Sequence, residues 1–465
     1  MLTFARKLHI NNFSCIMANV IKIKKGLDIN LKGKASDVLL NGGKSDSYAI
    51  VPDYYNGIIP KVVAKVGEKV KAGSVLMTDK NRPEIKFVSP VSGEVTAVNR
   101  GEKRKVLSIV VKPEAQIEYV DFGKKNVSSL KGEEVKEAIL HAGMWPFIKQ
   151  RPYDIVATPT DSPRDIFVSA FYSAPLAPNF DFILKGQEAD FQTGLDALAK
   201  LTSGKVYVGV RKGSSVSVKG VETVEVEGPH PAANVGVQIN HIKPVNKGEV
   251  VWVVNPADVI VIGRLFNKGV ADFSRLVVLT GSETTERGYI KAISGCTINS
   301  LVAGKIMAGK EHIRIISGNV LTGTHVQKDG FLGAYDNQIT VIPEGDDNNE
   351  FLGWGVPGFG KYSVSHSYPA FLMGSKKEYV IDARIQGGKR AMIMSNEYDK
   401  VFPMDIMPEY LLKAIIAYDI DKMENLGIYE VAPEDFALCE FVDTSKIEIQ
   451  KLVRNALDLL YKEMN

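Results

Sequence analysis

Short apolar runs that alternate with polar positions fill the chain from Ile21 to about Val111, and glycines separate them. Segments such as KVVAKVGEKVKAGSVL and KFVSPVSGEVTAVNRG show the two-residue period of half-buried strands. Gly67, Gly73 and Gly93 stand where two such runs must reverse direction, as turns with positive φ require. The pattern predicts an all-β module of short strands.

Helical and strand patterns alternate in the next part of the chain. Residues 127–143 carry apolar positions on one helical side and end at a glycine, which predicts a connecting helix. Residues 165–171 and 205–211 are predicted strands on either side of a helical pattern at 191–202, and 221–228 is a third strand. This β-α-β order predicts a parallel, doubly wound sheet of the Rossmann-like class.

Two further regions complete the pattern. Between Asp272 and Pro343 the predicted order is strand, strand, helix, strand, strand, which fits a β-grasp fold. Residues 408–427 and 446–464 have helical periodicity and predict a small helical domain. Asp443, followed by a threonine and a serine, is the expected N-cap of the last helix.

Length and composition favour a multi-domain protein that folds in water. The chain has 465 residues, which is too long for one hydrophobic core, and its 24% charged and 45% apolar residues are ordinary for globular proteins. A net charge of +3 provides no overall field to hold nucleic acid.

The longest apolar stretch, Val250 to Phe266, is interrupted by polar residues, so we expect no membrane-spanning helix. The N-terminal residues lack the apolar run of a signal peptide, which predicts cytoplasmic residence.

The cysteines and histidines do not show the spacing of a metal site. Cys15, Cys296 and Cys439 lie far apart and form no C-x2-C pair, which fits neither a disulfide framework nor a cysteine-ligated cluster. The histidines include no H-x3-H or H-E-x2-H pair. We therefore predict no metal site and assign no catalytic residue.

A phosphate-binding glycine loop is also missing from the pattern. A dinucleotide-binding sheet places G-x-G-x-x-G directly after its first strand. Here the strand that ends at Phe171 continues into Tyr172 to Pro178, with prolines where amide donors would be required. The glycine-rich stretch Gly353 to Gly360 precedes no helical pattern, and we interpret it as a tight aromatic turn.

The β module resembles the biotinyl/lipoyl hammerhead family. The spacing of valines and glycines from Val63 to Leu76, followed by SPVSGEV, carries this resemblance, and Thr78, Asp79 and Lys80 are similar to the hairpin that presents the modified lysine. The stretch from Lys80 to the following Ser-Pro is two residues longer than the lipoyl pattern. An ordinary turn lysine is the favoured interpretation, and a lipoyl- or biotin-type carrier or transferase is the alternative.

Several longer stretches carry a second resemblance. The segments GPHPAANVGVQINHIKPV, VVWVVNPADVIVIGRLFNKG, RIISGNVLTG and LGAYDNQITVIPEG are similar to the A-subunit family of the sodium-translocating NADH:quinone oxidoreductases. The match runs from about Val20 to the C-terminus. This family is related to the flavoprotein subunit of complex I and to the C subunit of the Rnf complex, which carry a glycine-rich FMN loop and clustered cysteines. Only Cys439, in the context LCEFV, remains here.

The resemblance implies a role within a membrane complex. It implies a peripheral subunit on the cytoplasmic face of the bacterial inner membrane that supports NADH-driven quinone reduction coupled to sodium export. FMN and the iron–sulfur centre would be held by the partner subunits of the complex (B to F). Quinone is a possible ligand of this chain, and neither a cofactor bound through cysteine nor nucleic acid is expected.

Two histidines are the candidates for contact with quinone. A quinone carbonyl needs a hydrogen-bond donor at the edge of an apolar pocket, and His230 and His241 are the best polar candidates in the stretch that carries the resemblance. His230 stands between two prolines, so a plain turn residue is the alternative. Trp145, Trp252 and Trp354 are interpreted as core or interface aromatics.

Pattern and resemblance together give one multi-domain α/β organisation with the following expected parts: an upstream extension at 1–16, a barrel-sandwich hybrid (lipoyl-like) domain at 17–120, a helical linker at 121–149, a Rossmann-like α/β domain without an FMN loop at 150–270, a β-grasp (SLBB-like) domain at 271–345, an irregular linker at 346–390 and a C-terminal helical domain at 391–465.

Overall fold

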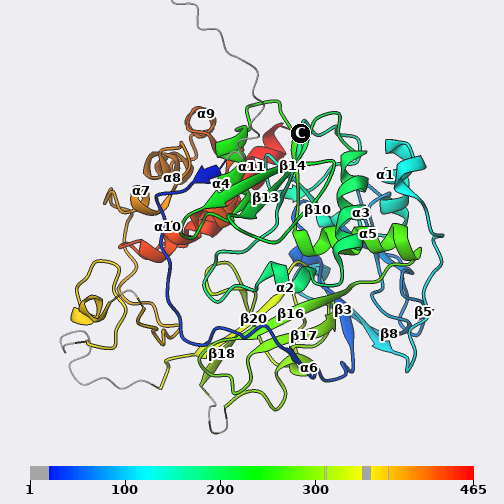
Figure 1. Ribbon diagram of the computed structural model, residues 1–465, viewed down its shortest axis with the longest axis horizontal. Coiled ribbons are helices and arrows are strands. Elements are labelled where there is room, and N and C mark those ends of the chain that lie inside the picture. The colour runs from blue at the N-terminus through cyan, green and yellow to red at the C-terminus, as the bar shows by residue number, and fades with distance from the viewer. Residues whose placement is uncertain (1–19, 308, 310–311, 348–357, 375, 465) are drawn as a thin grey trace, which may run out of the picture.

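A computed structural model describes residues 20–307, 309, 312–347, 358–374 and 376–464. The expected extension at 1–16 lies outside these residues, as do Cys15 and Trp354. Figure 1 shows an α/β sheet above a second sheet, with a β-rich module at one side and the C-terminal helices at the other. The molecule is therefore mixed α/β, built around several sheets.

The largest sheet has seven strands in the order β1-β14-β13-β12-β15-β10-β11. From β1 to β15 all neighbours are parallel, and β10 and β11 are antiparallel additions. Every residue of β12 is buried, as expected for a parallel strand covered on both faces. The β-α-β prediction is confirmed. The bounds are β1 Val20–Lys22, β10 Ile148–Arg151, β11 Ile155–Val156, β12 Ile166–Ser169, β13 Val206–Arg211, β14 Glu222–Glu227, β15 Val251–Val254, α2 Phe180–Leu184, α3 Glu188–Ala199, α4 Val235–Ile242 and α5 Pro256–Lys268.

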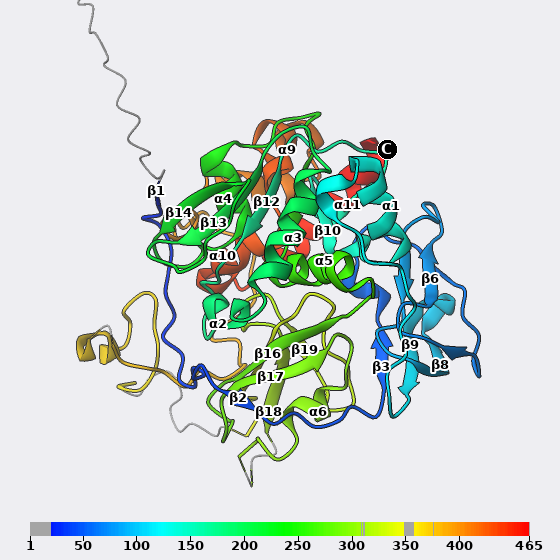
Figure 2. The same ribbon diagram turned by 45° about the vertical axis from the view of Figure 1, so that its right-hand side comes forward.

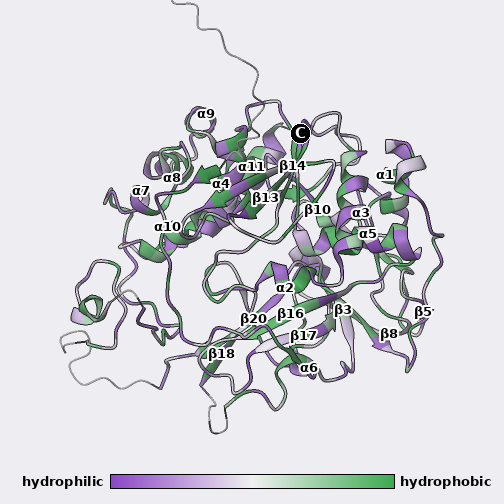
Figure 3. Ribbon diagram, in the orientation of Figure 1, coloured by the Kyte–Doolittle hydropathy of each residue, from purple (hydrophilic) through white to green (hydrophobic). Residues whose placement is uncertain are grey.

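Glycines allow α3 and α5, which cover this sheet, to pack closely against each other. A Cβ atom at Gly263 would lie 1.7 Å from the carbonyl oxygen of Asp190, and one at Gly194 would lie 2.1 Å from that of Val259. Both positions therefore exclude any side chain. Figure 3 shows hydrophilic and hydrophobic residues side by side on α3, as expected for a helix that covers a sheet with one face.

The second sheet has six strands in the order β19-β18-β20-β16-β17-β2. Its chain order of two strands, one helix and further strands matches the prediction, with a short strand β19 added. The bounds are β2 Leu39–Leu40, β16 Ser274–Thr280, β17 Gly288–Ile293, β18 Ile313–Ser317, β19 Thr324–Val326, β20 Gln338–Pro343 and α6 Ile298–Val302.

The β-rich module consists of a four-stranded sheet, β3-β9-β8-β5, and a three-stranded sheet, β4-β6-β7. Figure 2 brings this module to the right-hand side. The prediction of an all-β module is confirmed for the strands from Tyr48 onward. The bounds are β3 Tyr48–Ile50, β4 Pro60–Val62, β5 Lys69–Val70, β6 Val75–Asp79, β7 Lys86–Val88, β8 Gly93–Arg100 and β9 Val106–Pro113.

The first two strands differ from the prediction, because they join other sheets. β1 extends the α/β sheet by pairing with β14, and β2 pairs with β17 of the six-stranded sheet. Ile23, directly after β1, is buried with Val226 in a core shared with the C-terminal helices. Residues 20–40 thus cover the edges of two sheets, where unpaired backbone groups would otherwise face solvent.

The remaining helices are a connector and the C-terminal group. The helical pattern at 408–427 is divided, because Tyr418 has a positive φ and the Asp419 side chain accepts from Lys422 N to start α9. The prediction that Asp443 caps the last helix is wrong, because α11 starts at Ile449. The Asp443 carboxylate instead accepts from the backbone N–H groups of Ser445 and Ile447, in the turn before α11. The bounds are α1 Gly132–His141, α7 Tyr398–Val401, α8 Pro408–Ile416, α9 Ile420–Asn425, α10 Ala437–Val442 and α11 Ile449–Met464, with 3₁₀ turns at Pro52–Tyr54, Glu102–Arg104, Val127–Ser129, Trp145–Phe147, Pro369–Met373, Ile428–Glu430 and Pro433–Phe436.

Among the helices of the described residues, none combines the length and the apolar character that crossing a bilayer requires.

Candidate functional site

The carboxyl ends of β12 and β15 define the switch point of the parallel sheet. The chain leaves β12 to form β13 and β14 on one side, and then crosses to form β15 on the other side of β12. The loops after β12 and β15 therefore lead away in opposite directions. In open α/β sheets this is the crevice in which ligands bind.

Side chains of this chain fill that crevice. Tyr172, just after β12, donates its hydroxyl hydrogen to Asn255 Oδ1 at 3.1 Å, directly before α5. Asn337, from the loop before β20 of the other sheet, donates from Nδ2 to the Tyr172 hydroxyl oxygen at 2.5 Å. Burial raises the pKa of the Tyr172 phenol, so the hydroxyl keeps its proton for this bond. The three side chains join the two sheets at the place where a ligand would enter.

The N-terminus of α5 is likewise satisfied from within the chain. Asn255 Oδ1 accepts from Ala257 N at 3.0 Å, and Pro256 at the first helical position has no N–H to offer. Asp258 in the first turn is fully buried and pairs with Arg275 Nη2 at 2.8 Å. Burial raises the pKa of Asp258 to about 6, although the Arg275 charge opposes this shift. The first amide hydrogen of α5, which a bound phosphate would use, is therefore taken by Asn255, and Pro256 offers none.

His230, the first sequence candidate, follows β14 and is buried, with 4% of its surface exposed. Its Nδ1 lies 3.0 Å from Ser173 Oγ, and its backbone N–H donates to Asp28 Oδ1 at 2.9 Å. Burial lowers the pKa of the imidazole to about 4. The ring is therefore neutral near pH 7 and is enclosed by the segment that carries β1.

His241, the second candidate, lies in the last turn of α4 and is exposed. Its Nδ1 lies 2.8 Å from Val237 O, and because a carbonyl oxygen only accepts, Nδ1 carries the hydrogen. Nε2 of the neutral ring is then an acceptor, and it donates only when the ring is protonated. His230 and His241 stand at opposite ends of α4, which is roughly 12 Å long at the usual helical rise, so the structure does not bring them into one site.

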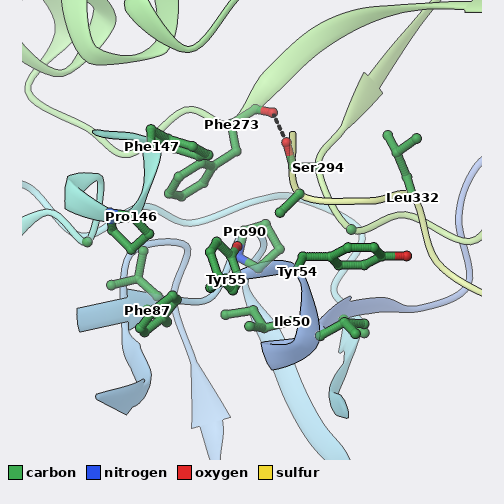
Figure 4. A pocket seen from close by; sticks show the side chains of 16 residues that line it. Ile50, Tyr54, Tyr55, Phe87, Pro90, Pro146, Phe147, Phe273, Ser294 and Leu332 are labelled. Atoms are coloured by element: carbon green, nitrogen blue, oxygen red, sulfur yellow. Dashed lines mark hydrogen bonds between the residues drawn. The ribbon is translucent and has the colours of Figure 1, made fainter. Parts of the chain in front are cut away.

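An aromatic pocket lies where the β-rich module, the connector after α1 and the six-stranded sheet meet (Figure 4). Its wall includes Tyr54, Tyr55, Phe87, Phe147 and Phe273. The rings of Tyr55 and Phe87 meet edge to face with centroids 4.7 Å apart. The open volume is only about 40 Å³, room for a water molecule or two and far below the several hundred Å³ of usual ligand sites. We interpret this pocket as an aromatic joint between parts of the chain.

A larger groove of about 430 Å³ lies beside α1. Phe122, His141 and Phe266 line it together with Lys86 and Glu137. The Phe122 and His141 rings meet edge to face at 5.4 Å. Sequence analysis missed this groove, because its walls come from four separate segments of the chain, and no local pattern marks them.

The hairpin with Lys80 is tied to the neighbouring α/β sheet. Asp79 is buried and pairs with Arg82 Nε at 2.7 Å. The same guanidinium donates to Gly57 O at 2.8 Å and to Thr158 Oγ1 at 3.1 Å. Lys80 itself is exposed. A carrier lysine needs a hairpin that is free to visit other sites, and the bonds of Arg82 hold this hairpin in place.

The described cysteines lie in hydrophobic cores. Cys296 and Cys439 are both buried, and burial raises the pKa of each thiol. Within the described residues, no cluster of three or more His, Cys, Asp or Glu side chains could hold a metal ion. Trp145 and Trp252 are fully buried and pack edge to face at 5.3 Å. Most of the glycine-rich stretch at 353–360 lies outside the described residues.

Three family models and several curated proteins are similar to this chain, and the curated proteins match nearly all of its length. Family models match at residues 21–114 (NqrA N-terminal barrel-sandwich hybrid domain), 130–271 (NqrA second alpha/beta domain) and 276–328 (NQRA C-terminal domain). The A subunit of the Na(+)-translocating NADH-quinone reductase of Neisseria meningitidis serogroup A is 36% identical over 450 residues, which cover 96% of this chain and 100% of that protein. The corresponding subunit of Yersinia pestis bv. Antiqua is 35% identical over the same shares of both chains.

A solved structure of an NAD+-reducing [NiFe]-hydrogenase in the H2-reduced state aligns with 75% of this chain and 66% of its own, at 11% identity and a TM-score of 0.36.

Proposed function

The chain belongs to the family of Na+-translocating NADH-quinone reductase A subunits, and from that premise we propose that it supports the quinone-reduction step and the assembly of the complex without a redox cofactor of its own. As a family member it is a subunit of the enzyme EC 7.2.1.1. In this proposal FMN and the iron–sulfur centre belong to the other subunits of the complex, B to F. The chain lies at the cytoplasmic face of the membrane, attached through the complex.

The filled switch point is the observation that carries this proposal. Tyr172, Asn255 and Asn337 satisfy one another in the crevice, and Asp258 provides the negative charge beside the α5 N-terminus. A flavin phosphate at the same end would find the Ala257 amide already bonded to Asn255 Oδ1, no amide hydrogen on Pro256, and the crevice filled by Tyr172 and Asn337. The residues therefore do not fit a flavin phosphate, and we derive no electron-transfer step through this chain.

Cofactor analysis of the purified chain tests this part. The isolated full-length chain should be colourless, release no flavin on denaturation and oxidise no NADH. A complex assembled without it should lose NADH-driven quinone reduction and regain it when the chain is added. Flavin in a stoichiometric amount, or NADH oxidation by the isolated chain, would contradict the proposal.

The quinone contact of His230 and His241 stays a prediction. His241 is the accessible candidate: its protonated ring could donate from Nε2 to a quinone carbonyl and transfer that proton as the quinone is reduced. His241→Gln should then lower quinone reduction by the complex and leave NADH oxidation with an artificial acceptor unchanged. His312→Gln, an exposed histidine beside β18, is the matched control.

Photo-crosslinking with a quinone analogue in the assembled complex would locate the contact. Labelled peptides from residues 228–245 support the histidine prediction. Labels on Phe122 or His141 would instead place the contact in the groove beside α1, whose volume suits a ligand.

A further inference from the structure

A small projecting tip exposes a row of apolar side chains. Residues 358–374 extend from the body below the C-terminal helices in both Figure 1 and Figure 2. Phe371, Leu372 and Met373 follow one another in a 3₁₀ turn, and Leu372 is 75% exposed. Phe359 is 61% exposed. We call these four residues the apolar tip.

Contacts within the segment hold the tip in shape. The Phe371 ring stacks on His366 with centroids 4.7 Å apart. Lys377 donates from Nζ to the Phe359 carbonyl oxygen and contacts Met373 Sδ at 2.9 Å. It therefore connects the two segments that form the tip. The exposed row is thus supported by specific contacts from behind.

Two tyrosines fix the base of the tip to the body. Tyr379 N–H donates to Asn30 O, and Tyr379 O accepts from Lys32 N, each at 2.8 Å. The Tyr362 ring meets Tyr379 edge to face at 5.2 Å and lies against Phe441 of α10. The tip is therefore presented by the fold at a defined place.

Basic side chains surround the tip. Lys361 lies over the ring of Tyr368, Lys377 lies over that of Tyr379, and Lys376 is exposed. Glu378 is the acidic residue of the same stretch. Apolar side chains beside the exposed Lys376 match the layered chemistry of an anionic membrane surface, because its ammonium group can lie at the phosphate level while the apolar groups enter the acyl boundary, and Lys361 and Lys377 add positive charge nearby.

The shape and the size of the tip bear on the choice between lipid and protein. Four partly exposed side chains offer on the order of 400 Å² of apolar surface, judged from ordinary side-chain areas. A stable protein interface takes about 800 Å² from each partner, of which roughly 450 Å² is apolar, so the projecting position of the tip and its lysines favour lipid, and the apolar area does not distinguish the two. A convex tip of this size does suit shallow insertion between headgroups.

We propose that the apolar tip inserts into the headgroup region of an anionic lipid bilayer and so anchors this chain directly to the membrane. This goes beyond the proposed function, which attaches the chain only through the other subunits. Insertion needs no other protein, so it can be tested on the full-length chain alone.

Vesicle flotation tests the proposal. The full-length chain should bind vesicles of phosphatidylethanolamine mixed with phosphatidylglycerol, and should bind phosphatidylcholine vesicles much less. Combined Phe371→Ser, Leu372→Ser and Met373→Ser should weaken binding at least about tenfold. Lys376→Glu should weaken it about fivefold, and added salt should do the same. Val66→Ser, at an equally exposed valine of the β-rich module, should bind like the parent.

Three other outcomes would contradict the proposal. Failure of the parent chain to bind anionic vesicles refutes it, as does unchanged binding by the triple variant with an unaltered unfolding midpoint. If that variant binds vesicles but no longer co-purifies with the membrane subunits, the tip docks on protein instead. Co-purification of the parent chain with the membrane subunits tests its membership of the complex separately.

Discussion

Substitution of His230 should change how the stability of the α/β sheet depends on pH. The imidazole is buried, and its pKa is lowered from 6.5 to about 4 in the folded chain. Below pH 6.5 the unfolded chain therefore binds a proton that the folded chain does not. The contribution of the neutral His230 ring to the free energy of unfolding is fully present above pH 6.5 and is lost as the pH falls toward 4. At pH 5.5 the shift corresponds to a loss of roughly 1 to 2 kcal/mol relative to pH 7.5.

His230→Gln lacks this titration and keeps a hydrogen-bonding side chain near Ser173. Urea unfolding followed by the fluorescence of the buried pair Trp145 and Trp252 should show the parent losing its advantage over the variant between pH 7.5 and 5.5. The comparison cancels every other titrating group. Val66→Ser should differ from the parent by a constant amount. Parallel pH profiles of parent and His230→Gln would refute the reasoning.

Two more substitutions test how the parts of the chain are joined. Asp435→Asn removes the buried carboxylate that accepts from Arg151 Nη1 at 2.8 Å, while Glu434 Oε1 stays 3.2 Å from Arg151 Nη2. It should destabilise the contact between α/β sheet and C-terminal helices by about 1.5–3 kcal/mol in urea unfolding, because one charged hydrogen bond is weakened and Glu434 remains, while Glu448→Gln, at an exposed pair, should leave the midpoint unchanged. Arg82→Ala should free its hairpin and speed tryptic cleavage after Lys80 severalfold; an unchanged rate would show that other contacts hold the hairpin. Intact mass should show no lipoyl or biotinyl group on Lys80, and either modification would revive the carrier alternative.

Local periodicity was sufficient to predict the central β-α-β unit of the seven-stranded sheet. The strands at 165–171 and 205–211 and the helix at 191–202 were all found near their expected positions. In these elements the burial of a residue depends on segments that are near in the chain: β12 is buried throughout because helices cover both faces of this parallel strand. The same reasoning worked for the strand and helix order between β16 and β20. It failed at the cap of α11, because Asp443 finds donors inside a tight turn.

Pairing between distant segments could not be predicted in this way. β1 has the same alternation as a strand of the β-rich module, and only the free edge of β14 decides where it pairs. The Arg151 and Asp435 pair joins residues 284 positions apart, and neither has a local signal beyond being charged. The groove beside α1 has the same origin, since its aromatic walls come from separate segments.

The two histidines predicted to contact quinone show the limit of a prediction that knows the chemistry of a side chain but not its position in the fold. His230 and His241 were chosen because imidazole can donate to a carbonyl at the edge of an apolar pocket. The structure gives the two rings different surroundings: one is enclosed and neutral, and the other is exposed with Nδ1 committed to Val237 O. Sequence analysis had no means to separate them, because both belong to the same short stretch. The distinction makes His241 the more informative position to substitute.

The missing glycine loop and the filled crevice are linked by the electrostatics of α5. A helix N-terminus favours one negative group, and here Asp258 takes that place with Arg275 as its partner. Glycines after β12 would supply amide donors, but Tyr172, Asn255 and Asn337 would still fill the crevice. Removing Asp258 alone would leave the buried Arg275 charge unpaired, at a cost of several kcal/mol. Phosphate binding would therefore need changes in both sheets at once, because the contacts that fill the crevice also join the two sheets.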